Sequence, residues 1–146
     1  MTSNAPNRTL ETPPATGLQR TARIALGAML LTAGIGHLTV LRREFRAQVP
    51  DWVPLPVDAT VVYSGIAEIA LGAALVLAPR RQQPALGQFA AAFFAAVFPG
   101  NVSQWLNRRD AFGLDTDAKR FARLFFQPGL IYWALKSTER RSARVR

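Results

Sequence analysis

The chain of 146 residues contains no cysteine and a single histidine, His37. The lack of cysteine excludes disulfide bonds. Haem, copper and zinc sites usually draw several ligands from histidine and cysteine. One histidine alone therefore excludes a self-contained metal or haem site of the usual ligand count, and with it an oxidase centre within this chain.

The sequence also lacks two common catalytic signatures. It contains no glycine-rich loop that would cradle a phosphate and no nucleophile elbow typical of serine hydrolases. We therefore expect no intrinsic catalytic activity and no intrinsic cofactor. An integral oxidoreductase built on this chain would need a cofactor borrowed from elsewhere.

Charge is scarce in three long stretches of the chain. Residues 24–41 and 82–107 carry no formal charge, and residues 59–79 carry one, Glu68. Apolar runs of about 20 residues are typical of membrane-spanning helices. The alternative is a soluble helical bundle, but soluble helices keep a charged face, which these segments lack. The sequence predicts an all-α integral membrane protein.

A shorter uncharged run over residues 124–135 completes the pattern of a four-helix transmembrane bundle within residues 21–136. The predicted helices span residues 22–41, 57–79, 84–106 and 118–135. We expect a disordered N-terminal tail over residues 1–20 and a basic C-terminal tail over residues 137–146. A secretory signal is the alternative for the first apolar run, but that run continues to Leu41 instead of stopping at a cleavage site.

The formal net charge is +9, yet the arginines flank the apolar runs instead of covering one face. We therefore expect phospholipid headgroups as counter-charge, and no nucleic acid. With four crossings, both termini and the turn at Pro79 share one side, which holds ten of the 18 lysines and arginines. This bias predicts a multi-pass protein of the cell membrane with both termini in the cytoplasm.

Glu68 stands near the middle of an apolar helix, where an ionisable group is costly. Ser64 and Gly72 share its helix face, so Glu68 should face a packed neighbour and not lipid. By helix rise Glu68 lies about 10 Å deeper than His37, which argues against a direct hydrogen bond between them. Arg123, reaching inward from the helix at 118–135, is its predicted counter-ion.

Seven polar residues spread over the four predicted helices form the candidate site: His37, Tyr63, Glu68, Asn101, Gln104, Arg123 and Gln127. In one interpretation they are interhelical hydrogen bonds worth about 0.6 kcal/mol each. In the other they line a pocket for a quinone headgroup or another small hydrophobic or protonatable ligand. The segment 42–56, with three prolines, is either an interfacial turn or a cap.

Four short strings resemble those of the DoxX-like family of small membrane proteins. They are Gly-Ile-Gly-His-Leu (34–38), Val-Pro-Asp-Trp-Val-Pro (49–54), Tyr-Ser-Gly-Ile-Ala-Glu-Ile (63–69) and Val-Phe-Pro-Gly-Asn (97–101). The order and spacing match from about residue 22 to 135. One departure concerns the last helix, where the family's Arg-Leu-Pro-Leu-Gln appears as Arg-Leu-Phe-Phe-Gln-Pro, which moves the proline past Gln127.

The resemblance implies a four-helix membrane bundle. The family name derives from a subunit associated with a terminal quinol oxidase, which implies a non-catalytic subunit or scaffold of a membrane redox or respiratory complex. The resemblance implies other membrane redox subunits as partners, beside the lipid bilayer expected from the apolar runs; the sequence leaves a homo-oligomer open. The resemblance also implies that related sequences carry the same polar residues at five positions: His37, Glu68, Asn101, Arg123 and Gln127.

Overall fold

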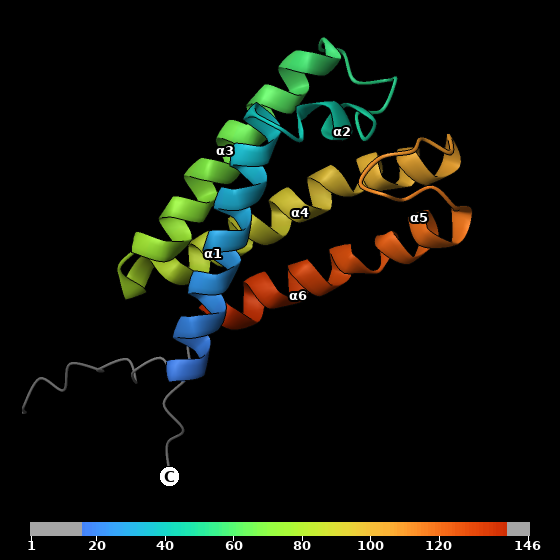
Figure 1. Ribbon diagram of the computed structural model, residues 1–146. Coiled ribbons are helices and arrows are strands. Elements are labelled where there is room, and N and C mark those ends of the chain that lie inside the picture. Colours follow the sequence, from blue (N-terminus) through green and yellow to red (C-terminus); the bar gives the residue numbers. More distant parts are fainter. Residues whose placement is uncertain (1–15, 140–146) are drawn as a thin grey trace, which may run out of the picture.

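The computed structural model describes residues 16–139, and all regular secondary structure in this range is helical (Figure 1). The prediction of an all-α chain is thus confirmed for the described residues. The helices are α1 (Gly17–Leu38), α2 (Arg42–Arg46), α3 (Val57–Leu77), the short 3₁₀ helix η1 (Arg80–Gln82), α4 (Gln83–Leu106), α5 (Asp117–Leu124) and α6 (Phe126–Thr138).

The long helices form two packed pairs, α1 with α3 and α4 with α6. The pairs meet near the start of α1 and the end of α6, and they diverge towards α2 and α5 (Figure 1). The buried apolar core lies at the closed end of this arrangement. It includes Leu26, Leu30, Leu75, Ala90, Phe94 and Ala134. The open end is where a cavity can form.

Two pairs of glycines set the closeness of α1 and α3. A methyl group added to Gly34 would lie 2.6 Å from the Gly65 carbonyl oxygen, and one added to Gly72 would lie 2.7 Å from the Gly27 carbonyl oxygen. Such close backbone contact is typical of helix pairs in lipid, where packing replaces the hydrophobic effect. The same contacts fix the antiparallel register of the two helices.

The N-terminal boundary differs from the prediction. The helix begins at Gly17 and not at residue 22, because Thr16 and Gln19 form a capping box: the Gln19 amide donates to the Thr16 hydroxyl at 3.2 Å, and the Thr16 amide donates to the Gln19 side chain at 3.4 Å. The predicted disordered tail is therefore wrong for residues 17–20, and residues 1–15 lie outside the described range. The helix also ends at Leu38, before the predicted residue 41.

The predicted single helix over residues 118–135 is wrong, because the structure divides it at Phe125 into α5 and α6. The physical reason is Pro128. It has no amide hydrogen to donate to the Leu124 carbonyl, and its ring clashes with that carbonyl, so α5 ends there. Helix α6 continues to Thr138, past the predicted end of the transmembrane domain at residue 136. Residues 140–146 of the predicted basic tail lie outside the described range.

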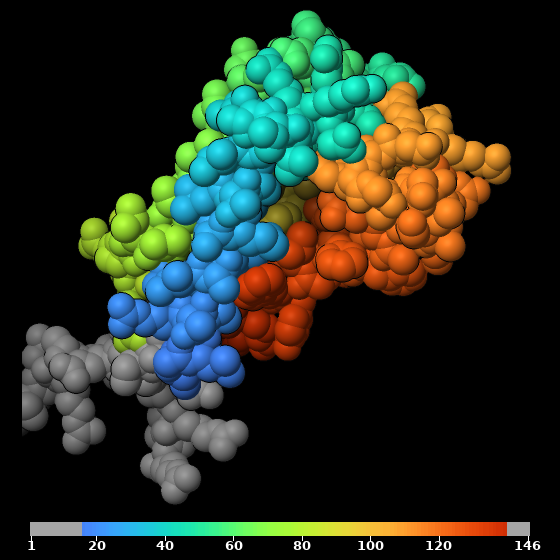
Figure 2. Space-filling model, in the orientation of Figure 1, coloured from blue at the N-terminus to red at the C-terminus, as the bar shows by residue number. Residues whose placement is uncertain are grey.

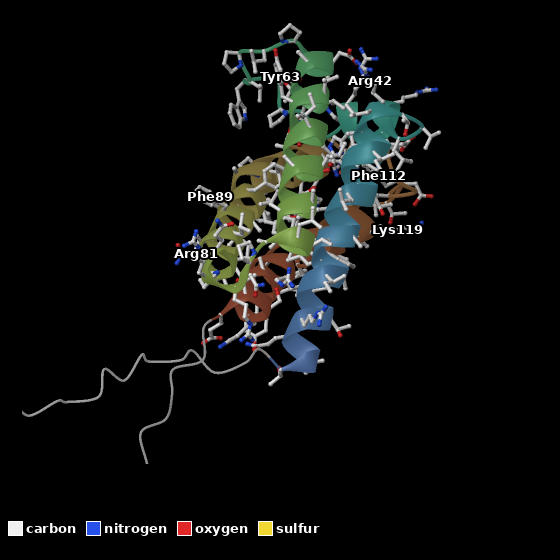
Figure 3. All side chains as sticks on the ribbon, turned by 90° about the vertical axis from the view of Figure 1, so that its left-hand side faces the viewer. Arg42, Tyr63, Arg81, Phe89, Phe112 and Lys119 are labelled. Atoms are coloured by element: carbon white, nitrogen blue, oxygen red, sulfur yellow. The ribbon has the colours of Figure 1, made fainter. Side chains whose placement is uncertain are left out.

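Between residues 16 and 139, three helices are long and apolar enough to cross a membrane: α1, α3, and α4 together with η1. Many large apolar side chains on them point outward, among them Phe89, which Figure 3 shows at the edge of the bundle. Such a surface suits lipid and not water. The helix α6 alone, with 13 residues, is too short to span a bilayer, although α5 and α6 lie end to end beside α4 (Figure 1).

Candidate functional site

A cavity of about 620 Å³ lies between the two helix pairs at their open end. Most of its lining is apolar and includes Met29, Leu30, Phe93, Phe94, Val97 and Leu130. Figure 2 shows a recess between α1 and α6, below α2, with α4 at its floor. A mostly apolar cavity of this size with a few polar groups is typical of a small-molecule site.

The segment 47–56 caps this cavity, so of the two interpretations left open for it the geometry favours the cap. Gln48, Val49, Pro50, Trp52 and Val53 all line the cavity. Arg109 ties the segment to the end of α4, because its guanidinium donates to the Val49 carbonyl at 2.8 Å and to the Asp51 carboxylate at 2.6 and 2.8 Å. At the other end, Arg42 of α2 donates to Asp58 of α3, which raises the pKa of the Arg42 guanidinium.

Glu68 is buried, as its helix face predicted, with 8% of its surface exposed. The expectation that it lies too deep to meet His37 is wrong: His37 Nδ1 is 3.0 Å from Glu68 Oε2. The helix-rise estimate ignored side-chain direction. Side chains lean towards the N-terminus of their own helix, so in this antiparallel pair His37 leans inward along α1 while Glu68 leans outward along α3.

This close contact leaves the Glu68 carboxylate unsatisfied. His37 Nδ1 lies 2.9 Å from the Ala33 carbonyl oxygen and, with its proton on that nitrogen, donates there. The Glu68 Oε2 atom has no hydrogen-bond partner among the described residues. The imidazole is further fixed by stacking on Phe45, with the ring centroids 3.3 Å apart. Glu68 thus presents a carboxylate at the cavity wall whose Oε2 atom has only a shared contact with His37 Nδ1.

Arg123 also lines the cavity, but the predicted ion pair with Glu68 is wrong. Within the described part of the chain Arg123 makes neither an ion pair nor a hydrogen bond, and its Nε atom is buried without a partner. Its guanidinium carbon instead lies 5.9 Å from the centre of the Phe112 ring. The break at Phe125 separates Arg123 from α6, so its side chain follows the short helix α5 towards the loop.

Four amide side chains form a connected network beside the cavity. Gln48 donates to Asn101 at 3.2 Å and to Gln104 at 3.1 Å, and Asn101 donates to Gln127 at 3.0 Å. The network ends on backbone, because Gln127 donates to the Phe94 carbonyl at 2.6 Å and Gln104 to the Arg109 carbonyl at 3.3 Å. It therefore joins the cap, α4 and α6 through side chains that bond to one another and to backbone carbonyls.

Of the seven candidate residues, five line the cavity: His37, Glu68, Asn101, Arg123 and Gln127. Gln104 is fully buried in the amide network and does not reach the cavity wall. Tyr63 lies apart, 61% exposed on the outer surface of α3. No cluster of three or more histidine, aspartate or glutamate side chains that could hold a metal ion occurs between residues 16 and 139.

Three residues of the site were missed at the level of sequence: Phe45, Gln48 and Phe112. Phe112 carries the one clear signal of unusual backbone, a φ of 55°, which is costly for a bulky side chain. Glu44 holds it there by accepting from the Phe112 amide at 2.6 Å, and its ring meets the Phe45 ring edge-on at 4.8 Å. Figure 3 labels Phe112 near the end of α1.

The fold and the site define a helical protein with three membrane-length helices and a capped internal cavity. Residues 26–138 match the family described as a domain of unknown function, DUF8561, and the chain belongs to this family. Comparison with curated proteins found no match, and neither did comparison with solved structures. The resemblance to the DoxX-like family stays a prediction.

Proposed function

We propose that this is an integral membrane protein that binds a small membrane-soluble ligand in the capped cavity. The observation that carries the proposal is the state of two charged residues. Glu68 and Arg123 both line the cavity, and each has a buried polar atom without a partner among the described residues. A ligand with a polar head would supply both missing partners.

The argument rests on the cost of unmet hydrogen bonds. A buried polar group without a partner costs about 1–3 kcal/mol, and a charged one costs more. The neighbouring amides avoid this cost by bonding to one another and to backbone. Ionisable groups in membrane helices that face an interior cavity are typical of binding and transport sites.

The shape of the cavity supports a ligand that arrives from the bilayer. Its recess opens sideways between α1 and α6, whereas the cap covers the end of the bundle (Figure 2). Aromatic side chains, among them Phe93 and Phe94, line the wall and suit a flat headgroup. A quinone, with its planar head and apolar tail, is the ligand class we put first.

The same proposal includes a topology. We place α5 and α6 together as a fourth, broken crossing, because they lie end to end alongside α4. An even number of membrane crossings is supported because the start of α1 contacts the end of α6, which puts both ends of the bundle on one side. There Trp133 donates to the Ala22 carbonyl at 2.9 Å. In this topology both ends lie in the cytoplasm and the protein resides in the plasma membrane.

Decylubiquinone, a short-tailed quinone, tests the proposal because quinones quench tryptophan fluorescence. Of the three tryptophans, Trp52 lines the cavity. With the protein in nanodiscs, we expect saturable quenching that is strongly reduced in Trp52→Phe and unchanged in Trp133→Phe. Quenching that does not saturate, or that is the same in the Trp52→Phe variant, would contradict binding in this cavity.

A scaffold role in a redox complex remains the second proposal, drawn from the DoxX-like resemblance. It is supported by an aromatic cluster on the outside of α4 and α5, where Trp105 and Phe125 flank Phe121 at ring separations of 5.2 and 5.4 Å. Phe125 is 66% exposed and free to contact another subunit. Purification from native membranes in mild detergent tests this role; recovery of the protein without other polypeptides would count against it.

A further inference from the structure

We infer that the ligand's head carries both a hydroxyl that donates to Glu68 and an oxygen that accepts from Arg123. The inference rests on the proposed function, since it assumes that the cavity binds a ligand, and it narrows the ligand class. The best-fitting class is an aromatic hydroxyl compound that also carries a carbonyl, attached to an apolar tail.

The chemistry of the two side chains sets this requirement. A guanidinium can only donate hydrogen bonds, and an ionised carboxylate can only accept them. His37 Nδ1 lies 3.0 Å from Glu68 Oε2 but also 2.9 Å from the Ala33 carbonyl oxygen, so its single proton is shared between two acceptors and does not saturate the carboxylate. Arg123 has no acceptor within the described residues, since its one polar contact is the face of Phe112.

The surrounding packing keeps these two charges from pairing with each other. Arg123 is held over Phe112, whose strained backbone is fixed by Glu44 and whose ring packs on Phe45. Phe45 in turn stacks on His37, which contacts Glu68. This chain of contacts links both charges through Phe112, Phe45 and His37, so the site is organised before any ligand arrives, which lowers the cost of binding.

Other ligand classes satisfy one half of the site only. A ligand with acceptors alone, such as a ketone or an oxidised quinone, can bind Arg123 but leaves Glu68 without a donor. Within the quinone class proposed above, the inference therefore selects the reduced form, whose hydroxyls donate to Glu68 and whose oxygens accept from Arg123. An alkylammonium would satisfy Glu68 but would be repelled by Arg123. A phenol with a carbonyl group offers a donor and an acceptor while remaining neutral overall, so it can partition from the bilayer.

Two matched probes test the inference: nonyl 4-hydroxybenzoate and nonyl 4-methoxybenzoate. They share the ring, the ester carbonyl and the tail, and differ in the hydroxyl that is methylated in the second. Affinities are measured by Trp52 quenching in nanodiscs and corrected for partitioning into empty nanodiscs. A hydrogen bond to a charged group predicts that the phenol binds about tenfold tighter or more.

Two variants locate the effect. We expect Glu68→Leu to remove the preference for the phenol, whereas Arg123→Met should weaken both probes by a similar factor and keep the preference. The ratio of the affinities for the two probes is measured on the wild-type protein. The test therefore remains valid even if the Glu68→Leu variant misfolds. Equal binding of the two probes to wild type would overturn this inference and leave the proposed function standing; failure of both to bind would contradict the proposed function itself.

Discussion

The amide network and the ionisable cluster lie side by side in this bundle and differ in one respect. In the network formed by Gln48, Asn101, Gln104 and Gln127, the side chains bond to one another and to backbone carbonyls. In the cluster formed by His37, Glu68 and Arg123, the two charged side chains keep buried atoms without partners. Polar residues in one membrane bundle can thus serve two purposes, and hydrogen-bond satisfaction distinguishes them.

The comparison suggests that the two interpretations of the polar residues apply to different residues. The amides bond to one another and to backbone, so their removal should weaken the fold. Under our proposal the charged residues bind the ligand, so their removal should leave the fold and change the binding. The expected loss of unfolding free energy is largest at the α1–α3 glycine contacts and smallest at Glu68.

Disrupting the glycine contacts between α1 and α3 should have the largest effect on stability. A side chain at Gly34 would strike the Gly65 carbonyl, so Gly34→Ile should destabilise the protein by about 3 kcal/mol. Unfolding of the detergent-solubilised protein measures the change. The control is Gly129→Ala, because no atom lies within 4 Å of the added methyl group; equal stability of the two variants would show that α1 and α3 do not pack as described.

Removing the centre of the amide network should have an intermediate effect. Asn101→Ala leaves the Gln127 side-chain oxygen without its donor, which we expect to cost about 1–2 kcal/mol. Gln104→Ala, which removes a network residue that does not reach the cavity wall, should keep ligand affinity within about twofold. A variant as stable as wild type would mean that the network does not hold the helices together.

Releasing the cap should have a smaller effect on stability. The Asp51 side chain is 80% exposed, so loss of its pairing with Arg109 in Asp51→Asn should cost less than about 1 kcal/mol. If the cap must move for the ligand to exchange, both association and dissociation should become faster, as stopped-flow quenching would show. Unchanged rates would indicate that the ligand exchanges through the lateral recess alone.

Removing the charge of Glu68 should have the smallest effect on stability. Its Oε2 atom has only a shared contact with His37 Nδ1, and burial makes its charge unfavourable, so Glu68→Gln should lower the free energy of unfolding by less than about 0.5 kcal/mol. Tyr63→Phe, on the outer surface of the same helix, is the matched control for binding. A large loss of stability in Glu68→Gln would mean that Glu68 stabilises the fold, as the amide network does.

Much of this architecture could be predicted from the sequence, because apolar length and small-residue spacing are local properties. The start of α3 at Val57 and the burial of Glu68 followed from them. The break at Phe125 also has a local cause, Pro128, whose effect on the preceding turn was not anticipated. The capping box at Thr16 was overlooked within a polar segment.

The partners of the site residues could not be predicted in the same way. Whether His37 meets Glu68 depends on the register and side-chain directions of two antiparallel helices, and these are set by the glycine contacts. The position of Arg123 depends on Phe112, whose left-handed backbone is stabilised by Glu44 from a distant part of the chain. Such contacts are tertiary and leave no periodic pattern in the sequence.

The most direct test of the distinction between the two regions is the affinity of Glu68→Gln for nonyl 4-hydroxybenzoate, measured by Trp52 quenching beside wild type and Gln104→Ala. We expect Glu68→Gln to bind about tenfold more weakly than wild type with unchanged stability, and Gln104→Ala, which removes a network residue away from the cavity wall, to bind normally with reduced stability. Normal binding by Glu68→Gln would contradict the assignment of the charged cluster to the ligand.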